Sequence, residues 1–196
     1  MKRRLFLHRS LPLLACPLAS LSIVPRARAG ARTSRPTQGI ATPDGQARNH
    51  ERIVVGQVPI LFKVLGKDTD GDMAAFVSSN NVPGFGPPLH VHHCIDEFFC
   101  VLAGEFAFQV GAEQTRLHPG DTILIPRNVP HAFDCVSAQP GKLLVTMQPA
   151  NHMEDFFRQL AQLLPGTGTG TPDFEAIKKL YQAHDSTIVG PPLRLK

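Results

Sequence analysis

The sequence of 196 residues contains no tryptophan and one tyrosine, but it contains twelve phenylalanines. Any aromatic core must therefore consist mainly of phenylalanine. Long apolar runs are also missing. The most apolar N-terminal stretch, residues 11–24, is interrupted by Pro12 and Pro17 and is too short and broken for a good transmembrane helix. The chain shows no internal repeat, so its length predicts one globular domain rather than two.

Acidic side chains are absent from residues 1–29, which hold six of the 20 lysines and arginines. The formal net charge of +4 comes from this segment, because the remaining residues have 14 basic and 16 acidic side chains. A basic chain often indicates a nucleic-acid or anionic-membrane partner. That inference does not apply here, because the excess positive charge belongs to residues 1–29, which we interpret as a targeting segment. In addition, no helix-turn-helix pattern flanks the central region. We therefore expect no nucleic-acid partner.

Residues 1–29 are organised like an export signal. A basic start precedes the apolar stretch, and Ala27 and Ala29 are small residues at the two positions that a signal peptidase reads. The pair Arg3-Arg4, followed by Phe6-Leu7, resembles a twin-arginine signal. We predict that residues 1–29 are a cleaved signal peptide of this type. The mature protein would be periplasmic or secreted, without a membrane anchor.

Two alternatives to this export route stay open. Residues 1–29 could be a general secretory signal without the twin-arginine function. The segment Leu13-Leu14-Ala15-Cys16 also loosely resembles a lipoprotein box, in which Cys16 would be lipidated. Leu14 is large for that motif, and Pro17 follows the cysteine at once, so we prefer the cleaved signal.

The mature chain has three parts. Residues 30–50 are polar and lack periodicity, which predicts a flexible linker. Residues 51–150 contain short apolar runs separated by turn residues, which predicts an all-β sandwich or barrel. Residues 151–196 form a C-terminal extension with two helices, one from Met153 to about Pro165 and one from Pro172 to His184, and a tail. The expected strands are residues 52–58, 60–65, 73–79, 89–94, 97–102, 105–110, 115–117, 122–125, 131–136 and 142–147.

Three histidines and one glutamate are spaced as metal ligands. His90 and His92 are two residues apart in an expected strand, so their side chains share one face, about 6.6 Å apart along the strand. A bend after His92 can bring Glu97 to the same interior, and His131 begins a later strand. We predict that these four residues bind one divalent transition metal. The ligand set suits Fe, Mn, Co, Ni, Cu or Zn without choosing among them.

The chain resembles the cupin superfamily through its first motif. That motif is a glycine, five residues, His-x-His, three or four residues, a glutamate, six residues and a glycine. This sequence has Gly84, His90, His92, Glu97 and Gly104, with every spacing matched. The resemblance implies a double-stranded β-helix, or jelly-roll barrel, around the metal.

The second cupin motif is present with two changes. Gly120, Pro126 and His131 occupy their expected positions. Asn128 replaces a glycine, which is a mild change because asparagine tolerates a left-handed turn. Cys135 replaces the final asparagine, which is not usually a ligand, so the metal site is retained.

Among cupins, the arrangement most resembles small single-domain proteins similar to bacterial quercetin dioxygenases. Their tails also contain a Phe-Phe-Arg helix and end near Gly-Pro-Pro, as in residues 156–158 and 190–192. This resemblance implies a metal-dependent dioxygenase acting on a flavonol-like or enolic small molecule, with Glu97 as a catalytic general base. It also implies a homodimer.

Two other functions stay open. The first is a non-catalytic cupin that holds a metal and a small ligand, because the fold hosts both roles. The second is a cupin isomerase or an oxalate-type enzyme, although Arg116 and Arg127 are the only basic residues near the motifs. The redox states of Cys94, Cys100 and Cys135 are also open. A Cys94–Cys135 disulfide is conceivable in an oxidising compartment, and Cys94 shares the strand parity of His90 and so could face the cavity.

Overall fold

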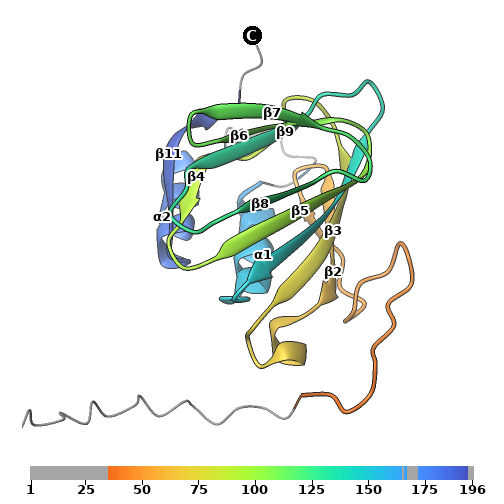
Figure 1. The fold of residues 1–196 in the computed structure, drawn as a ribbon. Helices are drawn as coiled ribbons and strands as arrows, with labels where there is room; N and C mark the ends of the chain where they lie inside the picture. Colours follow the sequence, from red (N-terminus) through yellow and green to blue (C-terminus); the bar gives the residue numbers. More distant parts are fainter. Residues whose placement is uncertain (1–34, 165, 167–171, 194–196) are drawn as a thin grey trace, which may run out of the picture. The chain divides into compact units, whose positions relative to one another are not determined.

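The computed structural model of this protein describes residues 35–164, 166 and 172–193. The expected signal peptide, including Cys16, lies outside these residues. The described part forms eleven strands and two α-helices (Figure 1). The strands are β1 (Ile53–Val55), β2 (Val58–Val64), β3 (Ala74–Asn81), β4 (Pro88–His92), β5 (Asp96–Ala103), β6 (Phe106–Val110), β7 (Glu113–Leu117), β8 (Thr122–Ile125), β9 (His131–Cys135), β10 (Gly141–Gln148) and β11 (Ser186–Pro192).

Two antiparallel sheets enclose the interior. One has the strand order β1-β2-β3-β10-β5-β8 and the other β11-β4-β9-β6-β7. From β3 to β6 and from β7 to β11, consecutive strands alternate between the sheets, and this gives the jelly-roll barrel of Figure 1. The predicted all-β jelly roll is confirmed. Each of the ten expected strands has a counterpart whose ends differ by a few residues.

Alternation of buried and more exposed residues shows which face of strand β10 points into the barrel. In β10, Leu143, Val145 and Met147 are buried and the residues between them are not. Phenylalanine fills the space between the sheets, as its abundance suggests. The Phe99 ring lies 5.2 Å from the rings of both Phe108 and Phe133, measured between centroids.

Two helices cover one side of the barrel interior. Helix α1 (Met153–Leu163) buries Met153, Phe156 and Leu160, and helix α2 (Phe174–Ala183) buries Ile177, Leu180 and Tyr181. Both extents agree with the sequence prediction. The Asp173 carboxylate caps α2 by accepting a hydrogen bond from the Ala176 amide at 3.0 Å. No helix in the described part of the chain is long and apolar enough to span a membrane.

Two segments differ from the sequence analysis. The C-terminal tail, in which no strand was predicted, forms strand β11 and pairs antiparallel with β4. Part of the segment expected to be a flexible linker lies along β2. There, the Arg48 amide donates to the Phe62 carbonyl at 2.7 Å, and the Lys63 ammonium donates to the Gln46 carbonyl at 2.6 Å. Of these two segments, the C-terminal tail completes the five-stranded sheet, because β11 forms its edge next to β4.

We predict that Phe108→Ala lowers the free energy of unfolding by about 3–5 kcal/mol, because it removes a fully buried ring from the aromatic cluster and leaves a cavity. Leu124→Ala is the matched control. Leu124 is 60% exposed on β8, so its loss should change the free energy by less than about 0.5 kcal/mol. Urea unfolding of both variants measures the difference. Equal losses would contradict this assignment of the core.

Candidate metal centre

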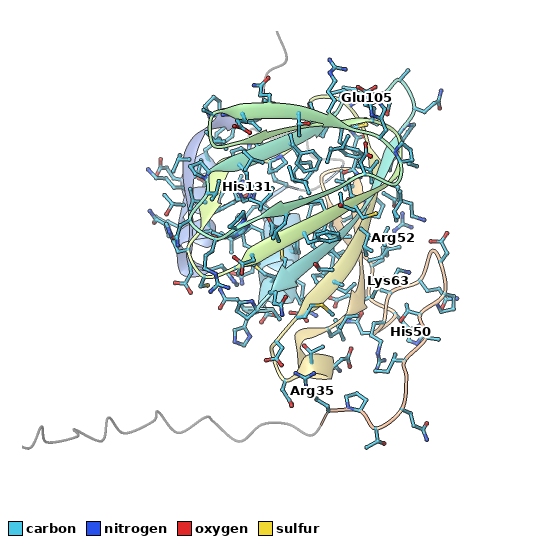
Figure 2. All side chains as sticks on the ribbon, viewed as in Figure 1. Arg35, His50, Arg52, Lys63, Glu105 and His131 are labelled. Atoms are coloured by element: carbon cyan, nitrogen blue, oxygen red, sulfur yellow. The ribbon has the colours of Figure 1, made fainter. Side chains whose placement is uncertain are left out.

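The four predicted ligands converge between the two sheets. His90 and His92 belong to β4 and His131 to β9, and His90 and His131 are register partners in the five-stranded sheet. Glu97 comes from β5 in the other sheet. One ligand atom from each residue lies within 4.8 Å of the others, and all four residues are buried. Figure 2 shows His131 inside the barrel.

Hydrogen bonds outside the cluster orient all three imidazoles. The Nδ1 atoms of His90 and His131 donate to the carbonyls of Pro88 and Val129, at 2.8 and 3.0 Å. The Nδ1 atom of His92 bonds to Ser186 Oγ at 2.7 Å, and that hydroxyl donates onward to the His184 carbonyl at 3.0 Å. The Nε2 atom of each histidine is thus left to coordinate a metal ion. This outer bonding is typical of metal-binding histidines.

The charge of Glu97 is balanced within the cluster. Its Oε2 atom lies 2.8 Å from His131 Nε2 and 3.5 Å from His92 Nε2. Burial acts to raise the pKa of Glu97, but His92 and His131 outweigh burial and lower it. Burial acts to lower the pKa of His131, but the hydrogen bond to Glu97, the charge of Glu97 and the bond to the Val129 carbonyl together raise it. The contact between Glu97 and His131 therefore favours the charged forms of both groups.

His90 differs in its protonation. Burial, followed by repulsion from His131 and His92, lowers the pKa of His90 to about 3. His90 is therefore neutral near pH 7 and its Nε2 lone pair is free to bind a cation. Three imidazole nitrogens and one carboxylate within reach of one point fit a single transition-metal ion.

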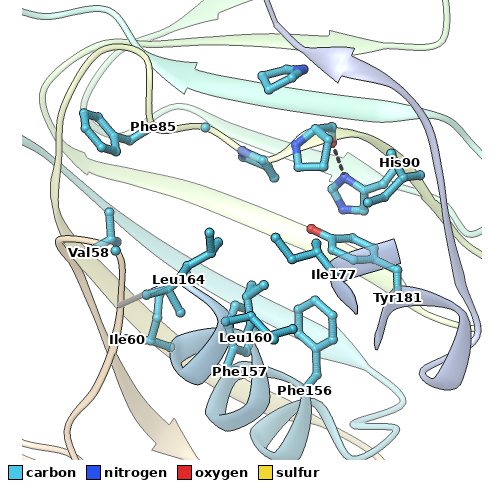
Figure 3. Close-up of a pocket in the computed structure, with 18 of the residues that line it drawn as sticks. Val58, Ile60, Phe85, His90, Phe156, Phe157, Leu160, Leu164, Ile177 and Tyr181 are labelled. Carbon is cyan, nitrogen blue, oxygen red and sulfur yellow. Dashed lines mark hydrogen bonds between the residues drawn. The ribbon is translucent and has the colours of Figure 1, made fainter. Parts of the chain in front are cut away.

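A cavity of about 1240 Å³ opens beside the cluster. His90, His92 and Glu97 line it at one end, while helices α1 and α2 supply much of its apolar wall (Figure 3). The wall includes Phe99, Phe133, Val145, Met147, Phe156, Phe157, Leu160, Ile177 and Ile188. Phe85 and Phe174 also line the cavity and are 58% and 70% exposed, so they lie where it meets solvent. This cavity suits an apolar small molecule.

Two residues beside the cluster were not predicted from the sequence to belong to the site. Ser186, at the start of β11, orients His92, and Tyr181, on α2, places its ring 5.5 Å from that of His90. The β-branched run at residues 187–189 is a strand signal that could have revealed β11. The placement of Tyr181 could not have been found, because its position in the apolar stripe of α2 also fits an ordinary core residue.

Several other sequence expectations can be compared with the structure. Cys94 lies beyond the end of β4, with Sγ 3.8 Å from Asp185 Oδ2, so it does not line the cavity as its parity suggested. Cys94, Cys100 and Cys135 are free thiols, so the conceivable Cys94–Cys135 disulfide is not formed. Arg116 and Arg127 are exposed and ion-paired with Glu105 and Asp96, at 2.8 and 2.7 Å. Neither arginine lines the cavity.

Comparison with known proteins agrees with this fold. The family model described as "Cupin domain" matches residues 81–147. Over 67 residues the chain is 31% identical to "Uncharacterized protein MJ1618" of Methanocaldococcus jannaschii, an alignment that covers 34% of this chain and 54% of that protein. The chain therefore spans about half the length of this curated relative.

Solved structures are similar at lower identity. An RmlC-like cupin from Shewanella frigidimarina is 18% identical with a TM-score of 0.49, and the match covers 60% of this chain and 96% of that one. KdgF from Halomonas sp. is 18% identical with a TM-score of 0.44, and the match covers 54% of this chain and 92% of that one.

We predict that Ser186→Ala weakens metal binding about 10- to 100-fold, because His92 loses the group that fixes its tautomer and ring orientation. Titration with Zn²⁺ or Co²⁺ against a competing chelator measures the affinity. Thr187→Val is the control, because Thr187 contacts the exposed His93 rather than a predicted ligand. Unchanged affinity in Ser186→Ala would refute the orienting role.

Proposed function

We propose, from the premise that residues 81–147 form a cupin domain, that this protein is a metal-dependent dioxygenase. Its ligands would be His90, His92, Glu97 and His131, holding one divalent transition metal. Its substrate would be a flavonol-like or enolic small molecule. The main support is the position of the cluster, which lies buried at one end of a large apolar cavity.

The composition of the cavity supports this substrate class. Apolar and aromatic side chains make up most of the wall, and they suit a planar aromatic molecule better than a sugar phosphate. Phosphate recognition favours arginine and lysine. Among the described residues that line the cavity, Lys178 is the only lysine or arginine. A cupin isomerase of sugar phosphates is therefore the weaker alternative.

Glu97 is the group that we assign as general base. It is the only carboxylate in the cluster, and it lies at the inner end of the cavity, where a substrate hydroxyl would meet it. The bound metal would supply Lewis-acid and redox chemistry beside the substrate. Glu97 would accept the hydroxyl proton, and its burial would keep that proton from exchanging freely with water.

The proposal is tested by elemental analysis of the native protein, followed by oxygen uptake with flavonols under aerobic conditions. We expect about one transition-metal ion per chain and substrate-dependent oxygen consumption. Absence of a bound transition metal would refute the metal centre. Stable binding of metal and flavonol without oxygen uptake would instead support the non-catalytic binding cupin.

We predict that Glu97→Gln lowers turnover by about 10²- to 10⁴-fold, because the amide cannot accept the substrate proton. Metal content and oxygen uptake are measured on the same preparation, so that loss of metal is separated from loss of the base. Glu105→Gln, on the exterior and paired with Arg116, is the matched control. A Glu97→Gln protein that retains its metal and full turnover would eliminate the base assignment.

We also propose export by the twin-arginine route, based on Arg3-Arg4 and the small residues Ala27 and Ala29. This route carries folded proteins, so the metal could be loaded in the cytoplasm before export. Replacing both arginines by lysine should leave the precursor in the cytoplasm, while wild type is found outside it, cleaved after Ala29. Cell fractionation with mass spectrometry measures both. Unprocessed wild-type protein in the cytoplasm would refute the proposal.

A further inference from the structure

Tyr181 is the only tyrosine of the chain and lies at the boundary between the metal centre and the apolar cavity. Two ring contacts hold its side chain in place. Its ring meets the His90 ring nearly at right angles, with centroids 5.5 Å apart, and meets the Phe156 ring in the same way at 5.0 Å. Figure 3 shows its hydroxyl directed into the cavity beside His90.

The Tyr181 hydroxyl has no hydrogen-bond partner within the described part of the chain, although the residue is only 4% exposed. Among the described residues, the fully buried side-chain atoms without a hydrogen-bond partner are Arg48 Nε and Asp134 Oδ1, so the Tyr181 oxygen is not sealed in the protein but borders the cavity. A phenylalanine would fill the same space between His90 and Phe156 but would present no hydrogen-bonding group to the cavity. The hydroxyl is therefore placed to bond with a group that enters the cavity.

We propose that Tyr181 is a substrate-binding residue whose hydroxyl donates a hydrogen bond to the enol or phenol oxygen of a planar aromatic ligand. This inference rests on the proposed substrate class. The ligand oxygen would lie between Tyr181 and the end of the cavity lined by His90 and Glu97. Its apolar body would extend along the wall formed by α1 and α2 toward Phe85 and Phe174.

The arrangement of the cavity explains why one hydroxyl would matter. The apolar wall can hold a flat molecule in either direction, since apolar contacts are non-directional. Tyr181 adds a directional donor at the end where the predicted ligands lie. It would therefore select ligands that carry an oxygen at the correct position and would turn that oxygen toward Glu97.

The test uses two ligands that differ only in this oxygen, 3-hydroxyflavone and flavone. Their affinities for wild type and Tyr181→Phe are measured by fluorescence and calorimetry, without oxygen, on metal-free and zinc-loaded protein. We expect Tyr181→Phe to weaken 3-hydroxyflavone about tenfold and flavone by less than about twofold, since one buried hydrogen bond contributes on this scale. Phe174→Ala is the control variant and should weaken both ligands equally.

Equal effects of Tyr181→Phe on the two ligands, no effect on either, or failure of both to bind wild type would each overturn the proposal. The ring is retained in this variant, so its thermal midpoint and zinc content should match wild type and show that folding is intact. Failure of the dioxygenase proposal gives a different pattern. The selective loss of 3-hydroxyflavone affinity would persist, but the native protein would lack a transition metal or would consume no oxygen.

Discussion

The contact between Glu97 and the histidines is the constraint on which the rest of the site depends. It joins the two sheets, because Glu97 belongs to β5 and the three histidines belong to β4 and β9. A carboxylate that is 4% exposed needs a cation beside it, since an unpaired buried charge is strongly destabilising. Either a protonated histidine or a bound metal ion can fill that role. Metal binding would thus take the place of a proton on His131, and the strands that form the barrel would set the positions of the ligands.

The C-terminal extension completes the site rather than only covering it. Ser186 on β11 fixes His92, while Tyr181 and Ile177 on α2 and Phe156 on α1 form the wall next to the cluster. β11, α1 and α2 thus each contribute residues to the same site. The pairing of β11 with β4 aligns Ser186 with His92 and Ile188 with His90, so that one strand carries a supporting hydroxyl and a wall residue together. The site would be incomplete in a barrel that ended at β10.

Much of this arrangement can be predicted from sequence because it rests on local spacing. The His-x-His pair predicts two side chains on one face of a strand, and alternation in β10 predicts its buried face. The two motifs place Glu97 and His131 with them. Contacts that join distant segments leave no such signal. Ser186 lies 94 residues from His92, and Tyr181 fits the apolar stripe of α2 whether or not its hydroxyl has a role. Parity also failed for Cys94, because β4 ends at His92 and the chain bends before the cysteine.

The combination of a mostly apolar wall with a smaller number of polar groups would determine how a ligand is recognised in the cavity. Apolar side chains give binding energy in proportion to the area that they cover, with little preference for orientation. Next to the predicted ligands, directional bonding would come from the polar atoms of His90, Glu97 and Tyr181. A molecule with oxygen at only one edge would therefore be oriented by that edge, while its size would be selected by the wall. The ligand would also keep water away from Glu97, because its apolar body would occupy the space between the carboxylate and the exposed rings of Phe85 and Phe174.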